Sequence, residues 1–172
     1  LDDQVSIMDL LEEKLSEYEG PYKLIPMPST RKYFRLLIEE WNTPKNRAGR
    51  AWGERGAYVL LELPLAGRNA TFKVICGQPP REWLAKAWER SKDPPFENSR
   101  RKRMPNKYLS LYSQTSTIDI QNLDPDAAHE VANDVWNWLV EILQHPNFKE
   151  SVNIITQMIE DLPEPEVFLT QS

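Results

Sequence analysis

Apolar residues recur at every third or fourth position near the N-terminus, which is the spacing of one face of an α-helix. The first such stripe runs from Ser6 to Tyr18, and Ser6 and Asp9 are spaced as in a capping box. A second stripe covers residues 29–41, and its shared apolar face consists of Phe34, Leu37, Ile38 and Trp41. The pattern therefore predicts two helices before residue 42.

The middle of the chain has the features of strands and turns. Residues 57–63 (AYVLLEL) and 70–77 (ATFKVICG) are rich in β-branched and aromatic residues, and the turn-forming run PLAGRN lies between them. From residue 108 onward, tyrosines and serines alternate with leucines, which is the two-residue period of a half-buried strand. Residues 42–56 are rich in Gly, Asn, Pro and Arg, so we expect a loop there.

Three further helices are predicted after residue 80, the first of them before the strand that starts at residue 108. Residues 81–91 follow Pro79 and Pro80, which are compatible with the first turn of a helix. Residues 123–144 carry an apolar stripe after Asp124, a favourable N-cap residue, and residues 147–161 carry another.

The order of these elements predicts an α+β fold, with a small antiparallel sheet of about three strands packed against about five helices. We expect one domain over residues 1–162, followed by a Pro- and acid-rich tail over residues 163–172.

Charge is unevenly distributed along the chain. The net charge is −5, yet residues 45–107 hold fifteen bases and six acids, whereas residues 108–172 hold one base and eleven acids. Cys76 is the sole cysteine, which excludes an internal disulfide and fits a reducing compartment. No stretch reaches the roughly 20 apolar residues of a membrane span. We therefore expect a cytoplasmic protein with no membrane partner.

The basic segments suggest contact with nucleic acid. Phosphates attract clustered Lys and Arg, and neighbouring aromatic rings can stack on bases. The candidate nucleic-acid-binding residues are Arg47, Arg50, Arg55, Arg81, Arg100, Arg101, Lys102, Arg103, Lys107 and Tyr108. Trp41, Trp52 and Tyr112 lie close by in sequence and could also stack. The alternative is a solvated basic face that pairs with the acidic C-terminal helices.

No catalytic, cofactor or metal-binding motif is complete. His129 lies beside Glu130, with Asp134 one turn further on, and a hydrolase using these groups is a third hypothesis. The sequence offers no nucleophile or metal-ligand set to support it. We therefore expect no catalytic activity, no cofactor and no metal in this chain.

Three segments carry a resemblance to a known group of proteins. They are CGQPPREW (76–83), the basic run RRKRMPNKYLSLYS (100–113) and the Trp-bearing EVANDVWNWL (130–139). Their order resembles the C-terminal part of PD-(D/E)XK nuclease-like bacterial proteins of the restriction and defence type. The residues that form the catalytic core of that family have no counterpart here. The resemblance implies a non-catalytic accessory domain of a DNA-handling protein.

Two functions follow as hypotheses. The first is a nucleic-acid-associated accessory domain that contacts the backbone, with DNA preferred over RNA. The second is a protein-interaction or homodimerisation module, in which the basic middle segment docks on acidic C-terminal helices.

Overall fold

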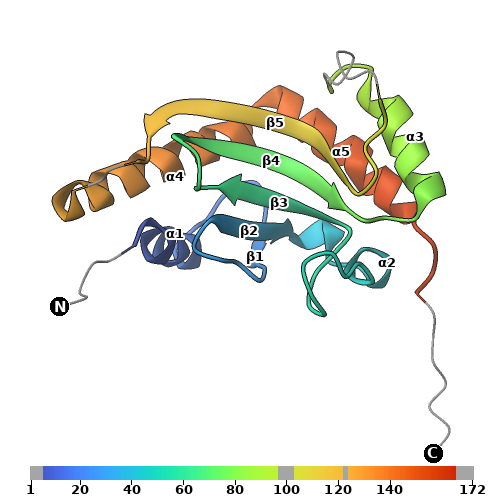
Figure 1. The fold of residues 1–172 in the computed structure, drawn as a ribbon, viewed down its shortest axis with the longest axis horizontal. Helices are drawn as coiled ribbons and strands as arrows, with labels where there is room; N and C mark the ends of the chain where they lie inside the picture. The colour runs from blue at the N-terminus through green and yellow to red at the C-terminus, as the bar shows by residue number, and fades with distance from the viewer. Residues whose placement is uncertain (1–5, 97–102, 122–123, 166–172) are drawn as a thin grey trace, which may run out of the picture.

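The computed structural model describes residues 6–96, 103–121 and 124–165. Its secondary structure is a mixture of strands and helices along the chain (Figure 1). In chain order the elements are α1 (Ile7–Ser16), β1 (Leu24–Pro26), β2 (Tyr33–Ile38), η1 (Glu39–Trp41), α2 (Pro44–Arg47), β3 (Val59–Pro64), β4 (Asn69–Gly77), α3 (Arg81–Ser91), β5 (Tyr108–Asp119), η2 (Pro125–Ala127), α4 (Ala128–Gln144) and α5 (Pro146–Glu160).

The strands form one five-stranded antiparallel sheet in the order β1-β2-β3-β4-β5. Every strand therefore pairs with its neighbour in sequence. Helices α4 and α5 lie behind the sheet in Figure 1, and α3 stands at one end of it. The α+β class is confirmed, and the sheet has two more strands than the three that we expected.

The predicted helix over residues 29–41 is wrong. The segment contains β2, which pairs with β1 on one side and β3 on the other, followed by the 3-10 turn η1. Both patterns fit its apolar residues, because Phe34, Leu36 and Ile38 alternate while Phe34, Leu37 and Ile38 also match helical spacing. Burial of apolar side chains on both faces of an inner strand hides the two-residue period.

The other predicted elements are confirmed with shifted ends. Ser6 and Asp9 form the capping box of α1, with the Asp9 amide donating to Ser6 Oγ over 3.1 Å. The predicted loop 42–56 also contains the short helix α2. Helix α4 begins at Ala128 after the turn η2, so Asp124 is not its N-cap, and no side chain caps that end.

The sheet has a helix-covered face and an open face. On the covered face Phe72 of β4 meets Phe148 of α5 edge-on, with ring centroids 5.6 Å apart. Tyr112 of β5 packs on the same Phe148 ring, with the centroids 5.4 Å apart. The open face is the opposite one, where the strand register aligns Arg35 with Glu62 and Glu62 with Lys73.

Helix α1 packs on α4 as well as on the main core. Leu10 joins Ala128 and Ala132 in a buried cluster, and Tyr18 meets Trp136 edge-on, with centroids 5.6 Å apart. The N-terminal helix thereby contacts the last third of the chain.

Candidate functional site

A row of aromatic and basic side chains crosses the open face of the sheet. Cζ of Arg35 lies 5.1 Å from the centre of the Tyr33 ring and 5.9 Å from that of the Trp52 ring. The Trp52 ring in turn lies 5.9 Å from the ring of Tyr108. We call these four residues the aromatic row. It runs from β2 to β5: Tyr108 is exposed, Tyr33 and Trp52 are partly buried, and the Arg35 side chain among them is 12% exposed.

Trp52 reaches the sheet because Gly77 leaves room for its ring. A Cβ atom on Gly77 would stand 2.6 Å from Cη2 of Trp52 and 2.7 Å from the Cβ of Ala51. Such distances are shorter than van der Waals contact, so any side chain at this position would displace the indole.

Arg47 and Asn46 hold the loop that carries Trp52. The Arg47 guanidinium donates to Asn42 Oδ1, to the Arg55 carbonyl and to the Gly56 carbonyl over 2.8–3.0 Å. The fully buried Asn46 amide donates to the carbonyls of Trp41 and Val59, and its Oδ1 accepts from the Val59 amide. Three N–H donors of Arg47 are thus used inside the loop, which gives this side chain a structural role there.

The basic residues of the middle of the chain fall into three segments, around residues 45–55, 81–92 and 100–107. Described residues of these segments meet beside the aromatic row. Trp52 belongs to the first segment and lies against Gly77, just before α3, which carries the second segment. The next residue, Gln78, donates its amide to the carbonyl of Lys107 in the third segment over 2.6 Å. Contacts at Gly77 and Gln78 therefore bring together stretches that are far apart in sequence.

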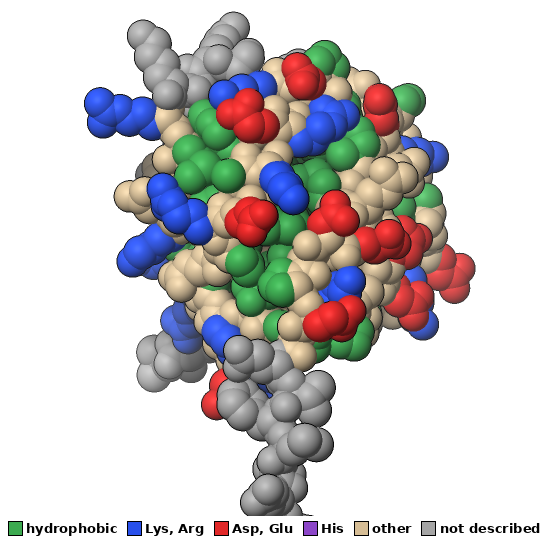
Figure 2. Space-filling view, turned by 90° about the vertical axis from the view of Figure 1, so that its right-hand side faces the viewer, with side chains coloured by type: hydrophobic (Ala, Val, Ile, Leu, Met, Phe, Trp, Pro, Cys, Tyr) green, Lys and Arg blue, Asp and Glu red, His purple; other side chains and the backbone are tan. Residues whose placement is uncertain are grey.

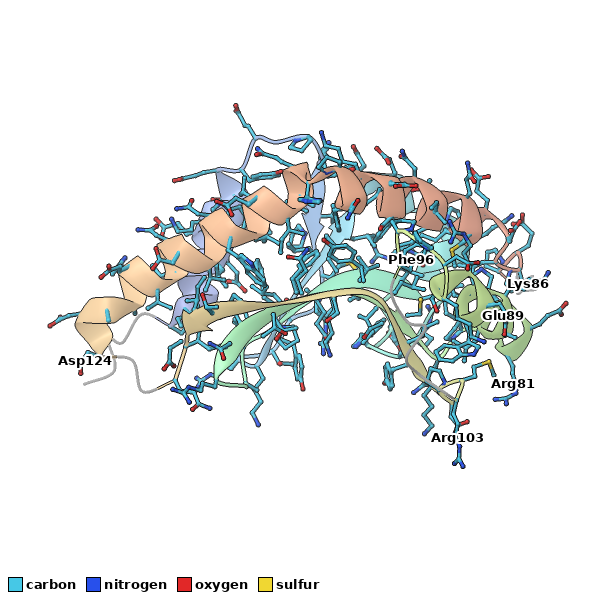
Figure 3. All side chains as sticks on the ribbon, turned by 90° about the horizontal axis from the view of Figure 1, so that it is seen from above. Arg81, Lys86, Glu89, Phe96, Arg103 and Asp124 are labelled. Atoms are coloured by element: carbon cyan, nitrogen blue, oxygen red, sulfur yellow. The ribbon has the colours of Figure 1, made fainter. Side chains whose placement is uncertain are left out.

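We define the basic rim as the exposed cations of the described stretches that meet at this junction: Arg50, Arg55, Arg81, Arg103 and Lys107. Arg50 donates to the carbonyls of Arg47 and Gly49. None of the five forms an ion pair with a carboxylate of the residues that the structure describes. In Figure 3 Arg103 projects away from α4 and α5, and Arg81 lies at the same end of the molecule.

Other basic residues of the three segments do not join the rim. Lys45 pairs with Glu164 over 3.4 Å, next to α5. Lys92 pairs with Glu89 over 3.1 Å, and Arg90 lies over the ring of Phe96. The predicted contacts Arg100, Arg101 and Lys102 lie outside the described residues.

Charge separates between the two sides of the molecule. Figure 2 shows Lys and Arg side chains gathered toward its left edge and Asp and Glu toward its right edge. The left of that view is the side of the open face, and the right is the side of α4 and α5. The folded protein thus keeps the segregation that the sequence shows.

The remaining candidates are separated from this surface. Trp41 is buried and donates its indole N–H to Thr156 Oγ1, so it cannot stack on a ligand. Tyr112 packs on the helix-covered face. His129, Glu130 and Asp134 are exposed along α4. Cys76 is buried in β4, and burial raises the pKa of its thiol. Among the described residues no three His, Cys, Asp or Glu side chains cluster to hold a metal ion.

Two members of the aromatic row were missed from the sequence. Tyr33 and Arg35 lie two positions apart on β2, which was predicted to be a helix. The strand register would have placed both side chains on one face of the sheet.

Across the described residues, no helix combines the length and the apolar character that crossing a membrane requires. No protein-family model, curated protein or solved structure matches the chain.

Proposed function

We propose that this domain binds single-stranded nucleic acid, DNA as first choice, across the open face of its sheet. The observation that carries the proposal is the junction itself, where the aromatic row lies beside five cations that form no ion pair with a described carboxylate. The function is that of a non-catalytic accessory domain, in keeping with the resemblance to nuclease-like proteins of restriction and defence systems.

Each part of the surface has a physical role in this proposal. The cations of the rim neutralise phosphates and release counterions, which makes binding depend on salt rather than on base sequence. Tyr108 is 40% exposed and offers a ring on which a base can stack. The Trp52 ring packs against the Tyr108 ring and holds it in place. Stacking on an aromatic side chain contributes about 1–3 kcal/mol per base and tolerates any base.

The proposal is tested by fluorescence anisotropy with a labelled oligothymidylate at low and moderate salt. We expect binding that weakens steeply with salt. The triple variant Arg81→Ala/Arg103→Ala/Lys107→Ala should reduce the slope of log K against log salt by roughly 0.7 for each lost phosphate contact. Tyr108→Ala should weaken binding at least fivefold at constant salt.

A matched control removes three cations from elsewhere. Lys14 lies on α1, Lys23 precedes β1 and Lys149 lies on α5, so the variant Lys14→Ala/Lys23→Ala/Lys149→Ala changes the net charge equally without touching the rim. Absence of binding at low salt, or an equal loss in both triple variants, would reject the proposal.

The second function, docking of the basic segment on acidic helices of a protein partner, is supported by the charge separation between the two sides of the molecule. It predicts salt-sensitive self-association that the rim triple variant abolishes.

A further inference from the structure

Strands β4 and β5 carry a group of polar side chains on the open face, beside the aromatic row. The register of their ladder pairs Lys73 with Ser113 and Thr71 with Thr115. The two register shifts of this ladder fall on either side of these pairs, so the stretch between them is regular. Because side chains alternate between the two faces of a strand, all four lie on the same face. We call Thr71, Lys73, Ser113 and Thr115 the polar shelf.

The polar shelf lies on the side of the sheet that α4 and α5 leave uncovered. Phe72, between the two shelf residues of β4, points the other way and packs on Phe148 of α5. Figure 3 shows α4 and α5 together on one side of the sheet, which leaves the shelf on the other side. In keeping with this position, the shelf residues of β5 are exposed and those of β4 are half-buried. Their side chains can therefore be reached from solvent.

Lys73 is the cation of the shelf, and no carboxylate of the described residues lies within ion-pair distance of its ammonium group. Its cross-strand neighbour Glu62 is buried and instead binds Arg35 over 3.0 Å. Asp119, at the end of β5, pairs with Arg68 over 3.8 Å. The two carboxylates that flank the shelf are thus engaged by other cations, and the shelf offers an ammonium group and three hydroxyls.

The position of the shelf sets the size of a ligand that touches both the shelf and the aromatic row. Tyr108, the exposed ring of the row, is paired with Gly77. Lys73 lies four residues from Gly77 along β4, which is about 14 Å at roughly 3.4 Å per residue. A single phosphate group cannot contact both places, whereas an extended strand can.

We propose that the backbone of the bound single strand continues from the aromatic row across the polar shelf, with a phosphate at Lys73. This path rests on the proposed function and deepens it, because the ligand is then an extended strand and not a single nucleotide held at the rim. The occupant is a nucleic-acid backbone on grounds of charge and chemistry: ammonium and hydroxyl groups contact phosphate oxygens, and they hold a strand without reading its sequence.

The test extends the anisotropy titration with labelled oligothymidylate to variants of the shelf. Lys73→Gln should lower the slope of log K against log salt by roughly 0.7, which corresponds to about fivefold weaker binding at 0.1 M salt. Thr115→Lys adds a second ammonium group and should strengthen binding, with a slope raised by up to roughly 0.7. A gain of affinity cannot arise from unfolding, so the test holds even if Lys73→Gln is unstable.

Gln157, exposed on α5, provides the matched controls. Gln157→Glu makes the same change in net charge as Lys73→Gln, and Gln157→Lys makes the same change as Thr115→Lys. Both controls should keep the wild-type slope and affinity. Tyr108→Ala should weaken binding without changing the slope, because stacking on a ring neutralises no phosphate.

The binding function and the path over the shelf can fail separately. A wild type that does not bind at low salt would refute both. If the wild type binds and the rim triple variant lowers the slope, while Lys73→Gln and Thr115→Lys behave like the Gln157 controls, the path alone is refuted. Tighter binding of polyglutamate than of oligothymidylate, with the same dependence on Lys73, would show that the occupant is an acidic peptide and would also overturn the path.

Discussion

Single residues decide whether the aromatic row exists. Gly77 is required not for its backbone angles but for the space above it, which the Trp52 indole occupies. Asn46 satisfies three backbone groups that would otherwise be buried without partners. An unsatisfied buried group costs about 1–3 kcal/mol, so this one side chain stabilises the loop more than most contacts do.

At Gly77 we predict that the change to Ala is destabilising. The new Cβ forces Trp52 and Ala51 away from β4, and overpacking of this kind costs about 1–3 kcal/mol. Urea unfolding followed by circular dichroism measures the change. The control is Gly67→Ala in the β3–β4 turn, where the nearest atom to a new Cβ is 3.9 Å away. An unfolding midpoint as high in Gly77→Ala as in Gly67→Ala would contradict this packing.

Among the helices and strands, the sequence predicts those in which one face is buried and the other exposed, because the period of their apolar residues then matches the element. Helices α3, α4 and α5 each bury one face, so the helical period of their apolar residues can be seen in the sequence. The alternation of buried Leu109 and Leu111 with more exposed residues likewise predicts the start of β5. Strand β2 has partners on both sides and buries residues of both faces, so its pattern also fits a helix.

The candidate site could be predicted only in part, for the same reason. The basic segments and Trp52 can be identified from the residue types in the sequence. Their meeting at Gly77 and Gln78 depends on pairing between distant segments, which no local pattern contains. The structural role of Arg47 in its loop could not be predicted, because a guanidinium that organises its own loop looks the same in a sequence as one that contacts phosphate.

Between β2 and β3 we predict strong coupling of Arg35 with Glu62. Their side chains are 12% and 7% exposed, and Nε of Arg35 lies 3.0 Å from Oε2 of Glu62. Arg35→Met should cost about 3 kcal/mol, because it leaves a carboxylate buried without this partner. The double variant Arg35→Met/Glu62→Leu should recover most of that loss. A double-mutant cycle from urea unfolding gives the coupling free energy.

The exposed pair Lys23–Glu39 is the control for this cycle. Its side chains are 74% and 53% exposed, and solvent screens such pairs, so Lys23→Met should change stability by less than about 1 kcal/mol. Additive effects of the Arg35 and Glu62 changes would show that the buried pair is not coupled.

The molecule is built on one sheet, and in the view of Figure 2 cations gather toward its open side and anions toward the side of α4 and α5. Its core is continuous, since residues from every strand except β1 and from α1, α3, α4 and α5 belong to one buried cluster. A local unfolding event that exposes the centre of β4 should therefore require the cooperative loss of that core.

Cys76 makes this cooperativity measurable. The thiol is fully buried in β4, and burial raises its pKa, which suppresses the reactive thiolate. We expect no reaction with Ellman's reagent at pH 8 in native buffer and rapid reaction in denaturing urea. The native rate should follow the free energy of global unfolding as urea is added. Fast labelling in native buffer would show that β4 opens locally instead.

The contact of α1 with α4 has a consequence for biosynthesis. Each strand can find its partner as soon as the next segment leaves the ribosome, since the sheet is built from neighbours in sequence. Helix α1 is different: Leu10 and Tyr18 have no α4 to cover them until the last third of the chain has been translated. During that interval the apolar stripe of α1 on the nascent polypeptide is exposed to solvent, where a chaperone can bind it.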